Sequence, residues 1–173
     1  MNGLADRPSF VVDSMLGKVA KWLRILGYDA RSAHLTEQRQ VEVYAAGGFQ
    51  ILTRNRRWCG RPRVICLEAN DPMAQLRELV VLIPLRIDPA RLLQRCVACN
   101  EPLEAAAREE VSGRVPDYIL ETQPRFHRCP RCHRLYWAGS HPSRMMERLR
   151  TALGKDAPEL GQSFGSRSKE ALS

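Results

Sequence analysis

The chain of 173 residues has 44% hydrophobic and 27% charged residues and a formal net charge of +8. No apolar run approaches the ~20 residues that cross a bilayer, and the first ten residues lack the basic and apolar regions of a secretory signal. We therefore expect a cytoplasmic globular protein with no membrane partner, whose positive charge favours a polyanion such as RNA as partner.

Strands and helices alternate in the first half of the chain. The pattern predicts strands over residues 10–12, 49–53 and 64–67, and helices over residues 15–26, 36–46 and 73–79. Gly27 follows the first helix as a C-cap, and a short extended segment follows around residues 28–30. Such alternation is typical of an α/β fold, in which helices cover both faces of a parallel sheet.

The composition changes near residue 89, where cysteine pairs replace the regular helical periods. We predict an α/β domain over residues 9–89 and a small cysteine-bearing module over residues 90–150. Residues 151–173 lack apolar periodicity and are predicted to be a disordered tail.

Two C-x2-C pairs lie in the second part, CVAC at Cys96 and Cys99 and CPRC at Cys129 and Cys132. Each pair offers two thiolates from a tight turn, and together they form the four-cysteine Zn²⁺ site of a zinc ribbon. The 29 residues between the pairs exceed the usual spacing, so part of them must form an insertion. With no open coordination position, this zinc is expected to be structural.

Other cysteines and histidines lie near these motifs. His127 and His133 flank the second pair and are the alternative zinc ligands or phosphate contacts. Cys59 and Cys66 match neither pair, and Cys66, in an apolar strand, is expected to be an inert core residue. We expect no disulfide, because the cytosol keeps thiols reduced.

Acidic residues in the first domain indicate a second kind of metal site. Asp13 ends the first predicted strand, at the carboxyl end where open parallel sheets gather functional groups. The further acids expected to approach it are Asp29, Glu37, Glu42, Glu68 and Asp71. Clustered carboxylates favour Mg²⁺ or Mn²⁺, which activate water for phosphodiester cleavage. The alternative for Asp13 alone is the N-cap of the next helix.

Six segments carry a resemblance to a known family. They are VDSMLGKVAKWLRILGYDA, ILTRNR, NDPMAQL, RCVACNEPL, RVPDYI and FHRCPRCHRLYWAGSHPSRM. Over roughly residues 9–148 the chain resembles the RNase domain named after the C-terminal part of the Mut-seven exonuclease. The resemblance implies a PIN-like nuclease fold followed by a zinc ribbon, metal-dependent cleavage of RNA, and Asp13 as the acid of the first strand.

One position departs from the family. Its members commonly read LTRDR where this chain reads LTRNR, so Asn55 replaces an aspartate that the resemblance implies as a metal ligand. Asparagine offers only a neutral carbonyl, and we expect weakened metal binding through Asp13, Asp29 and either Glu37 or Glu42. The alternative is a catalytically weakened or inactive PIN-like protein that binds RNA. A zinc ribbon that mediates protein contacts is a third reading, but it leaves the acids and the charge unexplained.

Basic residues are in excess by four in both residues 1–90 and residues 91–150. Arginine forks suit phosphates, and neighbouring aromatic rings suit unpaired bases. The candidate RNA contacts are Lys18, Lys21, Arg24, Arg54, Arg56, Arg57, Arg128, Arg131 and His141. The alternative for each is an ordinary solvated surface, and nothing in the sequence indicates the oligomeric state.

Overall fold

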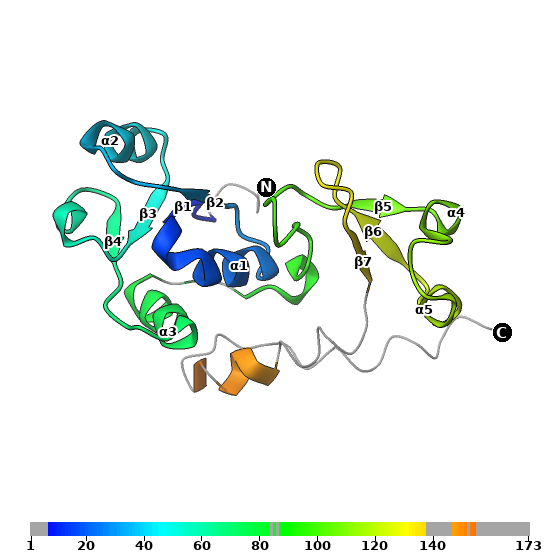
Figure 1. Ribbon diagram of the computed structural model, residues 1–173. Coiled ribbons are helices and arrows are strands. Elements are labelled where there is room, and N and C mark those ends of the chain that lie inside the picture. The colour runs from blue at the N-terminus through cyan, green and yellow to red at the C-terminus, as the bar shows by residue number, and fades with distance from the viewer. Residues whose placement is uncertain (1–6, 84, 86, 138–146, 152, 155–173) are drawn as a thin grey trace, which may run out of the picture.

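The computed structural model describes residues 7–83, 85, 87–137, 147–151 and 153–154. In Figure 1 a parallel sheet with its helices occupies one side and a small three-stranded sheet the other. The predicted α/β fold and the four-cysteine module are both confirmed. No helix within the described ranges is long and apolar enough to cross a membrane.

The larger sheet has four parallel strands in the order β2-β1-β3-β4. They are β1 (Phe10–Asp13), β2 (Ala30–Ala33), β3 (Gln50–Thr53) and β4 (Val64–Cys66). Every residue of β1 is buried, as expected for a central strand covered on both faces. The register pairs Phe10 with Ala30 and Asp13 with Ala33. The first pair therefore lies at the edge where the parallel strands begin, and the second at the edge where they end.

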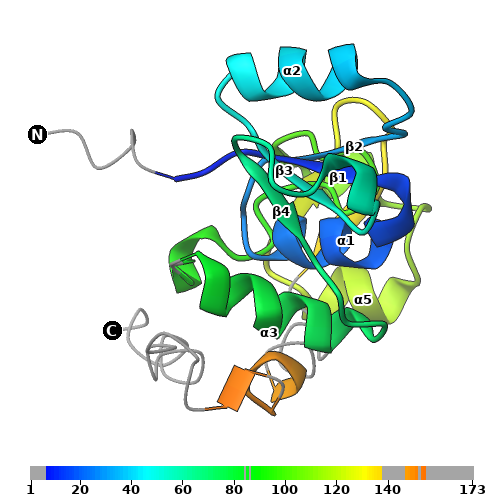
Figure 2. The same ribbon diagram turned by 90° about the vertical axis from the view of Figure 1, so that its left-hand side faces the viewer.

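Helices cover both faces of this sheet, as Figure 2 shows. Helices α1 (Gly17–Ile25) and α3 (Pro72–Leu82) pack on the face to which Phe10 and Val12 contribute. Helix α2 (Gln38–Ala46) packs on the other face, against Val11 and its neighbours. The alternation of β1 side chains between two cores therefore gives three layers.

A glycine is required where α1 turns into β2. Gly27 has a φ of 82°, a conformation that costs glycine little. A Cβ atom at this position would also collide with the carbonyl oxygen of Arg91, in the turn η3 (Pro89–Arg91). Gly27 thus lets the chain after α3 pass directly over the end of α1.

The smaller sheet is antiparallel and consists of β5 (Glu104–Ala106), β6 (Phe126–Arg128) and β7 (Leu135–Trp137). The insertion between the cysteine pairs forms β5 and the short helices α4 (Arg108–Val111) and α5 (Asp117–Thr122). Their apolar residues close a separate small core around Val111, Val115 and Phe126. Three buried residues make a weak core, so this module needs another source of stability.

The chain returns to the first core after the smaller sheet. Leu149 and Leu153 are fully buried in the cluster that α1 and α3 share, and their helical segment lies along α3 in Figure 2. The predicted disordered tail is therefore wrong at its beginning, while residues 155–173 lie outside the described residues. The domain boundary near residue 89 stays a prediction.

A disulfide joins Cys59 and Cys66, whose Cα atoms lie 5.7 Å apart. The turn η2 (Arg56–Trp58) carries Cys59 back to β4, where Cys66 is only half-buried. The prediction of an unpaired, inert Cys66 is wrong. The apolar pattern of the strand shows burial, but it does not show that the turn η2 brings Cys59 next to Cys66.

Candidate functional site

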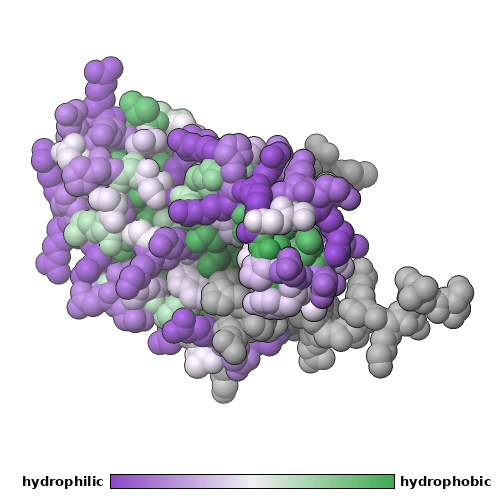
Figure 3. All heavy atoms as spheres, turned by 45° about the vertical axis from the view of Figure 1, so that its right-hand side comes forward, coloured by the Kyte–Doolittle hydropathy of each residue, from purple (hydrophilic) through white to green (hydrophobic). Residues whose placement is uncertain are grey.

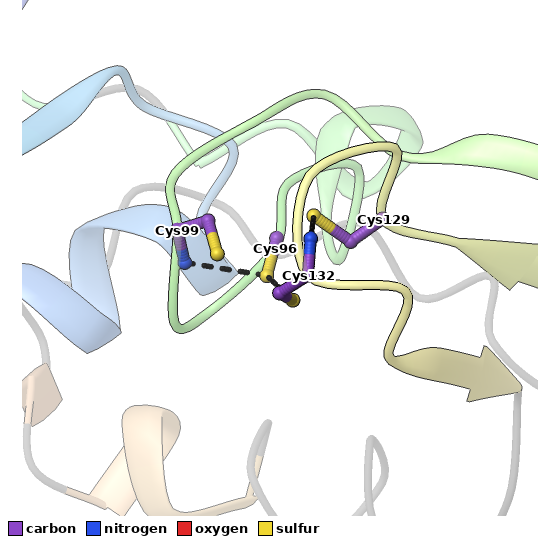
Figure 4. Close-up of side chains that lie close together, drawn as sticks. All are labelled: Cys96, Cys99, Cys129 and Cys132. Atoms are coloured by element: carbon purple, nitrogen blue, oxygen red, sulfur yellow. Dashed lines mark hydrogen bonds between the residues drawn. The ribbon is translucent and has the colours of Figure 1, made fainter.

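Two turns bring the four predicted zinc ligands together, and Figure 4 shows them converging from two segments of the smaller module. The sulfur atoms of Cys96, Cys99, Cys129 and Cys132 all lie within 4.8 Å of one another. The Sγ atoms of Cys96 and Cys132 are 3.6 Å apart. A tetrahedral ion with Zn–S bonds of about 2.3 Å requires sulfur separations of about 3.8 Å. The donor set therefore fits one structural Zn²⁺.

Both turns have the same backbone design. The amide of Cys99 donates to Cys96 Sγ at 3.3 Å, and that of Cys132 donates to Cys129 Sγ at 3.5 Å. The residue after each pair has positive φ, 69° at Asn100 and 58° at His133. Within the described residues the metal-binding cluster contains cysteines only, so neither His133 nor His127 joins it.

The environment of Cys96 favours its thiolate. Burial raises the pKa of Cys96, but hydrogen bonds from the Tyr136 hydroxyl and the amides of Cys99 and Ala98 outweigh it and lower the pKa to about 6. The Tyr136 oxygen lies 3.1 Å from Cys96 Sγ. Zinc binds cysteine as the thiolate, so a lowered pKa of Cys96 favours the form of this residue that binds the metal.

Asp13 lies at the carboxyl end of β1 with only 3% of its surface exposed. Thr53 Oγ1 donates to Asp13 Oδ2 at 2.7 Å, and Ser14 Oγ lies 3.4 Å from Asp13 Oδ1. Asp13 makes no side-chain cap to the following turn, so the capping alternative does not describe it. The structure instead holds a buried carboxylate in place through the neighbouring strand.

The other predicted acids do not gather around Asp13. Asp29 precedes β2 and lies at the opposite edge of the sheet, where it accepts from Asn100 Nδ2 at 2.6 Å. Its predicted approach to Asp13 is therefore wrong. Glu37 begins α2 on the surface, and Glu42 lies further along that helix, 4.0 Å from Arg61. In the described parts of the chain, no group of three carboxylates lies close enough to share an ion.

A histidine that the sequence analysis missed lies at the Asp13 edge. His34 follows β2 directly, and its Nδ1 atom lies 3.0 Å from Ser14 Oγ. The signal for His34 is its place immediately after a parallel strand. The sequence does not reveal this position, because β2 has the sequence ARSA with only one buried residue and so lacks the apolar pattern of a strand.

Asn55 follows β3 at the same edge. Its side-chain carbonyl accepts from the amide of Arg57 at 3.1 Å and so caps the turn η2. Its own amide donates to Thr53 Oγ1 at 3.0 Å. Thr53 therefore connects the backbone of Asn55 to the carboxylate of Asp13.

A cleft of about 660 Å³ opens beside Asp13. Ser14, next to Asp13, lies in its wall, and Lys18 and Lys21 of α1 are exposed along it. The remaining walls include Arg54, Asn70 and Ala98, the last from the zinc-binding turn. Arg54 Nη2 is held by Asn70 Oδ1 at 2.5 Å. The cleft thus has positive charge along its walls, and Ser14 in its wall directly follows the buried Asp13 in the chain.

The other predicted RNA contacts are dispersed. Arg56 is exposed on η2, and Arg57 stacks on Trp58 with 4.7 Å between the guanidinium and the ring centre. Arg128 in β6 pairs with Glu104 at 3.9 Å. Arg131 in the second zinc turn is 69% exposed and lies 3.8 Å from Glu101. His141 lies outside the described residues.

A family model, the Mut7-C RNAse domain, matches residues 8–149. The chain belongs to this family. Searches of curated proteins and of solved structures found no match. The match spans both sheets, the four-cysteine turns and Leu149.

In this Mut7-C domain, Arg24 joins the zinc module to the sheet. It is 5% exposed, and its donors reach Ala30 O at 2.8 Å, Val97 O at 2.9 Å, Ala98 O at 3.0 Å and Ser32 Oγ at 2.8 Å. Burial lowers the pKa of Arg24, while the nearby Cys96 and Cys99 sulfurs oppose that shift. Arg24 is also a predicted RNA contact, but here its donors are occupied by acceptors within the protein.

Replacing Arg24 by methionine is expected to lower the free energy of unfolding by about 3 kcal/mol, since buried carbonyls lose charge-assisted hydrogen bonds worth roughly 1.5–3 kcal/mol each. Urea denaturation of zinc-loaded protein measures this. Arg39→Met, at an exposed site on α2, is the matched control, with an expected change within about 0.5 kcal/mol. Equal effects of the two substitutions would show that Arg24 does not join the two parts.

Proposed function

We propose that this protein is a metal-dependent ribonuclease that cleaves RNA in the cleft beside Asp13. The observation that carries this proposal is the buried carboxylate of Asp13, which lies 3.4 Å from Ser14 Oγ, while Ser14 lines a cleft together with Lys18, Lys21 and Arg54. A carboxylate holds a cation, and the basic walls attract the phosphates of the substrate. Membership of an RNase-domain family supports the same reaction and substrate.

A single carboxylate suits Mg²⁺ or Mn²⁺ chemistry. Magnesium is usually bound through one or two carboxylates together with substrate phosphates, rather than by a cage of protein ligands. Bound there, the ion would polarise the scissile phosphate and activate water. Thr53 fixes Asp13 Oδ2, Ser14 and His34 lie within hydrogen-bonding distance of each other beside it, and Lys18 and Lys21 hold the RNA backbone.

The zinc module has an indirect role in this proposal. Ala98, between the first two cysteine ligands, forms part of the cleft wall and is held there by Arg24. Zinc fixes the turn that carries Ala98, so it shapes the cleft without taking part in the cleavage. Its basic residues then extend the surface that binds RNA.

A second function, RNA binding without cleavage, is favoured by a specific observation. The side chain of Asn55 is neutral and already caps η2, and the described acids do not cluster around Asp13. Such a protein would bind RNA with a strong dependence on salt and show no turnover with Mg²⁺ or Mn²⁺.

Replacing Asn55 by aspartate separates the two functions. Aspartate caps a turn as well as asparagine does, so the fold should be kept while a carboxylate is restored near Asp13. We expect Mn²⁺-dependent cleavage of labelled RNA to rise about 10-fold, the lower end of the 10–100-fold range typical of groups that tune a metal site. Gln123→Glu adds the same charge in the smaller module and should leave the rate of Mn²⁺-dependent RNA cleavage unchanged.

Two outcomes would count against the ribonuclease. One is salt-dependent RNA binding with no cleavage by either the native protein or Asn55→Asp, which would establish the binding function instead. The other is equal stimulation by Asn55→Asp and Gln123→Glu, which would show that the position of the new charge is irrelevant.

A further inference from the structure

A second cavity of about 650 Å³ lies at the junction of the two modules. We call it the junction cavity. Its walls come from α1, the start of β2, and the two zinc-binding turns. Four arginines and two acids line it: Arg24, Arg31, Arg95, Arg131, Asp29 and Glu101. The junction cavity therefore has an excess of positive charge.

The junction cavity adjoins the cleft beside Asp13. Arg24, Ser32 and Ala98 line both spaces, so the two spaces lie next to each other on the surface. Asp29 marks the amino edge of β2, whereas the cleft opens at the carboxyl edge. The two spaces together follow the length of β2, about 10 Å for its four residues.

The arginines of the junction cavity differ in how many of their donors already bind acceptors within the protein. Arg24 is buried and satisfied by four acceptors, and Arg95 Nη1 donates to Asn100 O at 2.7 Å. Arg31 is 57% exposed and lies 3.7 Å from Asp29, with its guanidinium over the ring of Phe49. Arg131 is exposed to a similar degree and lies 3.8 Å from Glu101.

Exposed ion pairs at these distances contribute little to stability. Arg31 and Arg131 can therefore exchange their carboxylates for a stronger acceptor at little cost. Asp29 is additionally held by Asn100 Nδ2, so it stays in place when Arg31 turns away. The two arginines form a pair of guanidinium forks, one from each module, and such forks match the geometry of phosphate oxygens.

We propose that the junction cavity is a second phosphate-binding subsite, which holds the backbone of single-stranded RNA next to the nucleotides in the cleft beside Asp13. This inference rests on the proposed function for the identity of the nucleic acid. Among the residues that the structure describes, no aromatic side chain lines the cavity, so the subsite contacts phosphates rather than stacking bases, and it does not select a sequence. It favours RNA long enough to occupy both spaces.

Binding of labelled oligouridine, measured by fluorescence anisotropy without added Mg²⁺ or Mn²⁺, tests the subsite. The double variant Arg31→Ala/Arg131→Ala should bind an RNA of about 12 nucleotides roughly 10-fold more weakly than the native protein. Its slope of log K against log[salt] should be smaller by about 1.4, since each phosphate contact on a single strand contributes about 0.7. A dinucleotide should bind both proteins equally, because its single phosphodiester is short enough to lie in the cleft alone.

Arg39→Ala provides the matched control, because this exposed arginine of α2 lines neither space. It should leave the affinities for both RNAs and the salt slope unchanged. Zinc content and the thermal midpoint verify that the double variant is folded. An unchanged salt slope, or an equal loss of affinity for the short and the long RNA, would overturn the subsite.

The binding assay does not depend on cleavage. If the protein binds RNA without turnover, the ribonuclease proposal fails while the difference between short and long RNA still decides the subsite. If cleavage occurs but the double variant retains native affinity and slope, the subsite alone fails.

Discussion

Replacing Asp13 by asparagine is expected to reduce Mn²⁺-dependent RNA cleavage at least about 100-fold, because even groups that only support a metal ligand are worth 10–100-fold. The substitution keeps the shape of the side chain, and Thr53 Oγ1 can still donate to its remaining oxygen. What is lost is the negative charge that holds the cation. Initial rates with labelled single-stranded RNA at saturating Mn²⁺ measure the effect.

Asp117→Asn is the control for Asp13→Asn. Asp117 is an exposed aspartate in the first turn of α5, on the smaller module, and its substitution should leave the rate unchanged. Thermal unfolding of both variants verifies that the fold is kept. A native rate in folded Asp13→Asn would remove Asp13 from the mechanism and with it the proposed site.

Loss of zinc is expected to unfold the smaller module. Zinc binding to isolated zinc-finger peptides contributes about 10–16 kcal/mol, far more than the small core around Val111 and Phe126 supplies. The double variant Cys129→Ala/Cys132→Ala should contain no zinc, whereas the native protein should contain one ion per chain. Limited proteolysis should cut the variant between β5 and β7 and spare β1–β4.

The disulfide supplies the control for the zinc variant. Cys59→Ser/Cys66→Ser removes the same number of cysteines, and neither residue lies in the zinc cluster. It should retain one zinc per chain and a protease-resistant smaller module. A zinc ion retained by Cys129→Ala/Cys132→Ala, or lost from Cys59→Ser/Cys66→Ser, would contradict the assignment of the ligands.

The zinc ligands and the central strands could be predicted because their signals are local. A C-x2-C spacing builds its own turn, and β1 is an uninterrupted buried run. Asp29 was predicted at the wrong edge of the sheet because the sequence did not show where β2 begins. Since β2 begins at Ala30, the residue before it lies at the amino edge of a parallel sheet, opposite to Asp13.

Arg24 shows a second limit of sequence patterns. Lys18, Lys21 and Arg24 are three residues apart and seem to share one face of α1, but each step of three residues turns the helix by 300°. After two such steps Arg24 points about 120° away from Lys18, into the junction with the zinc turn. Only the acceptors Val97 and Ala98, more than seventy positions later in the chain, reveal why a buried arginine is tolerated there.

The space-filling view in Figure 3 shows hydrophilic side chains over most of the face that it presents, with smaller apolar areas between them. Patterns of charge therefore identify the surface well but do not separate contacts with RNA from solvated positions. Which basic residues face a cavity follows from the residues that line it together. These residues are distant in the sequence, so no single segment reveals them.

The return of Leu149 and Leu153 to the first core has a consequence for biosynthesis. The residues that complete the packing beside α3 leave the ribosome only after both zinc-binding turns have been made. The packing of the larger module is therefore complete only after the smaller module has been synthesised, although domains commonly fold in order from the N-terminus. The helical segment with Leu149 and Leu153 supplies the last residues of that core.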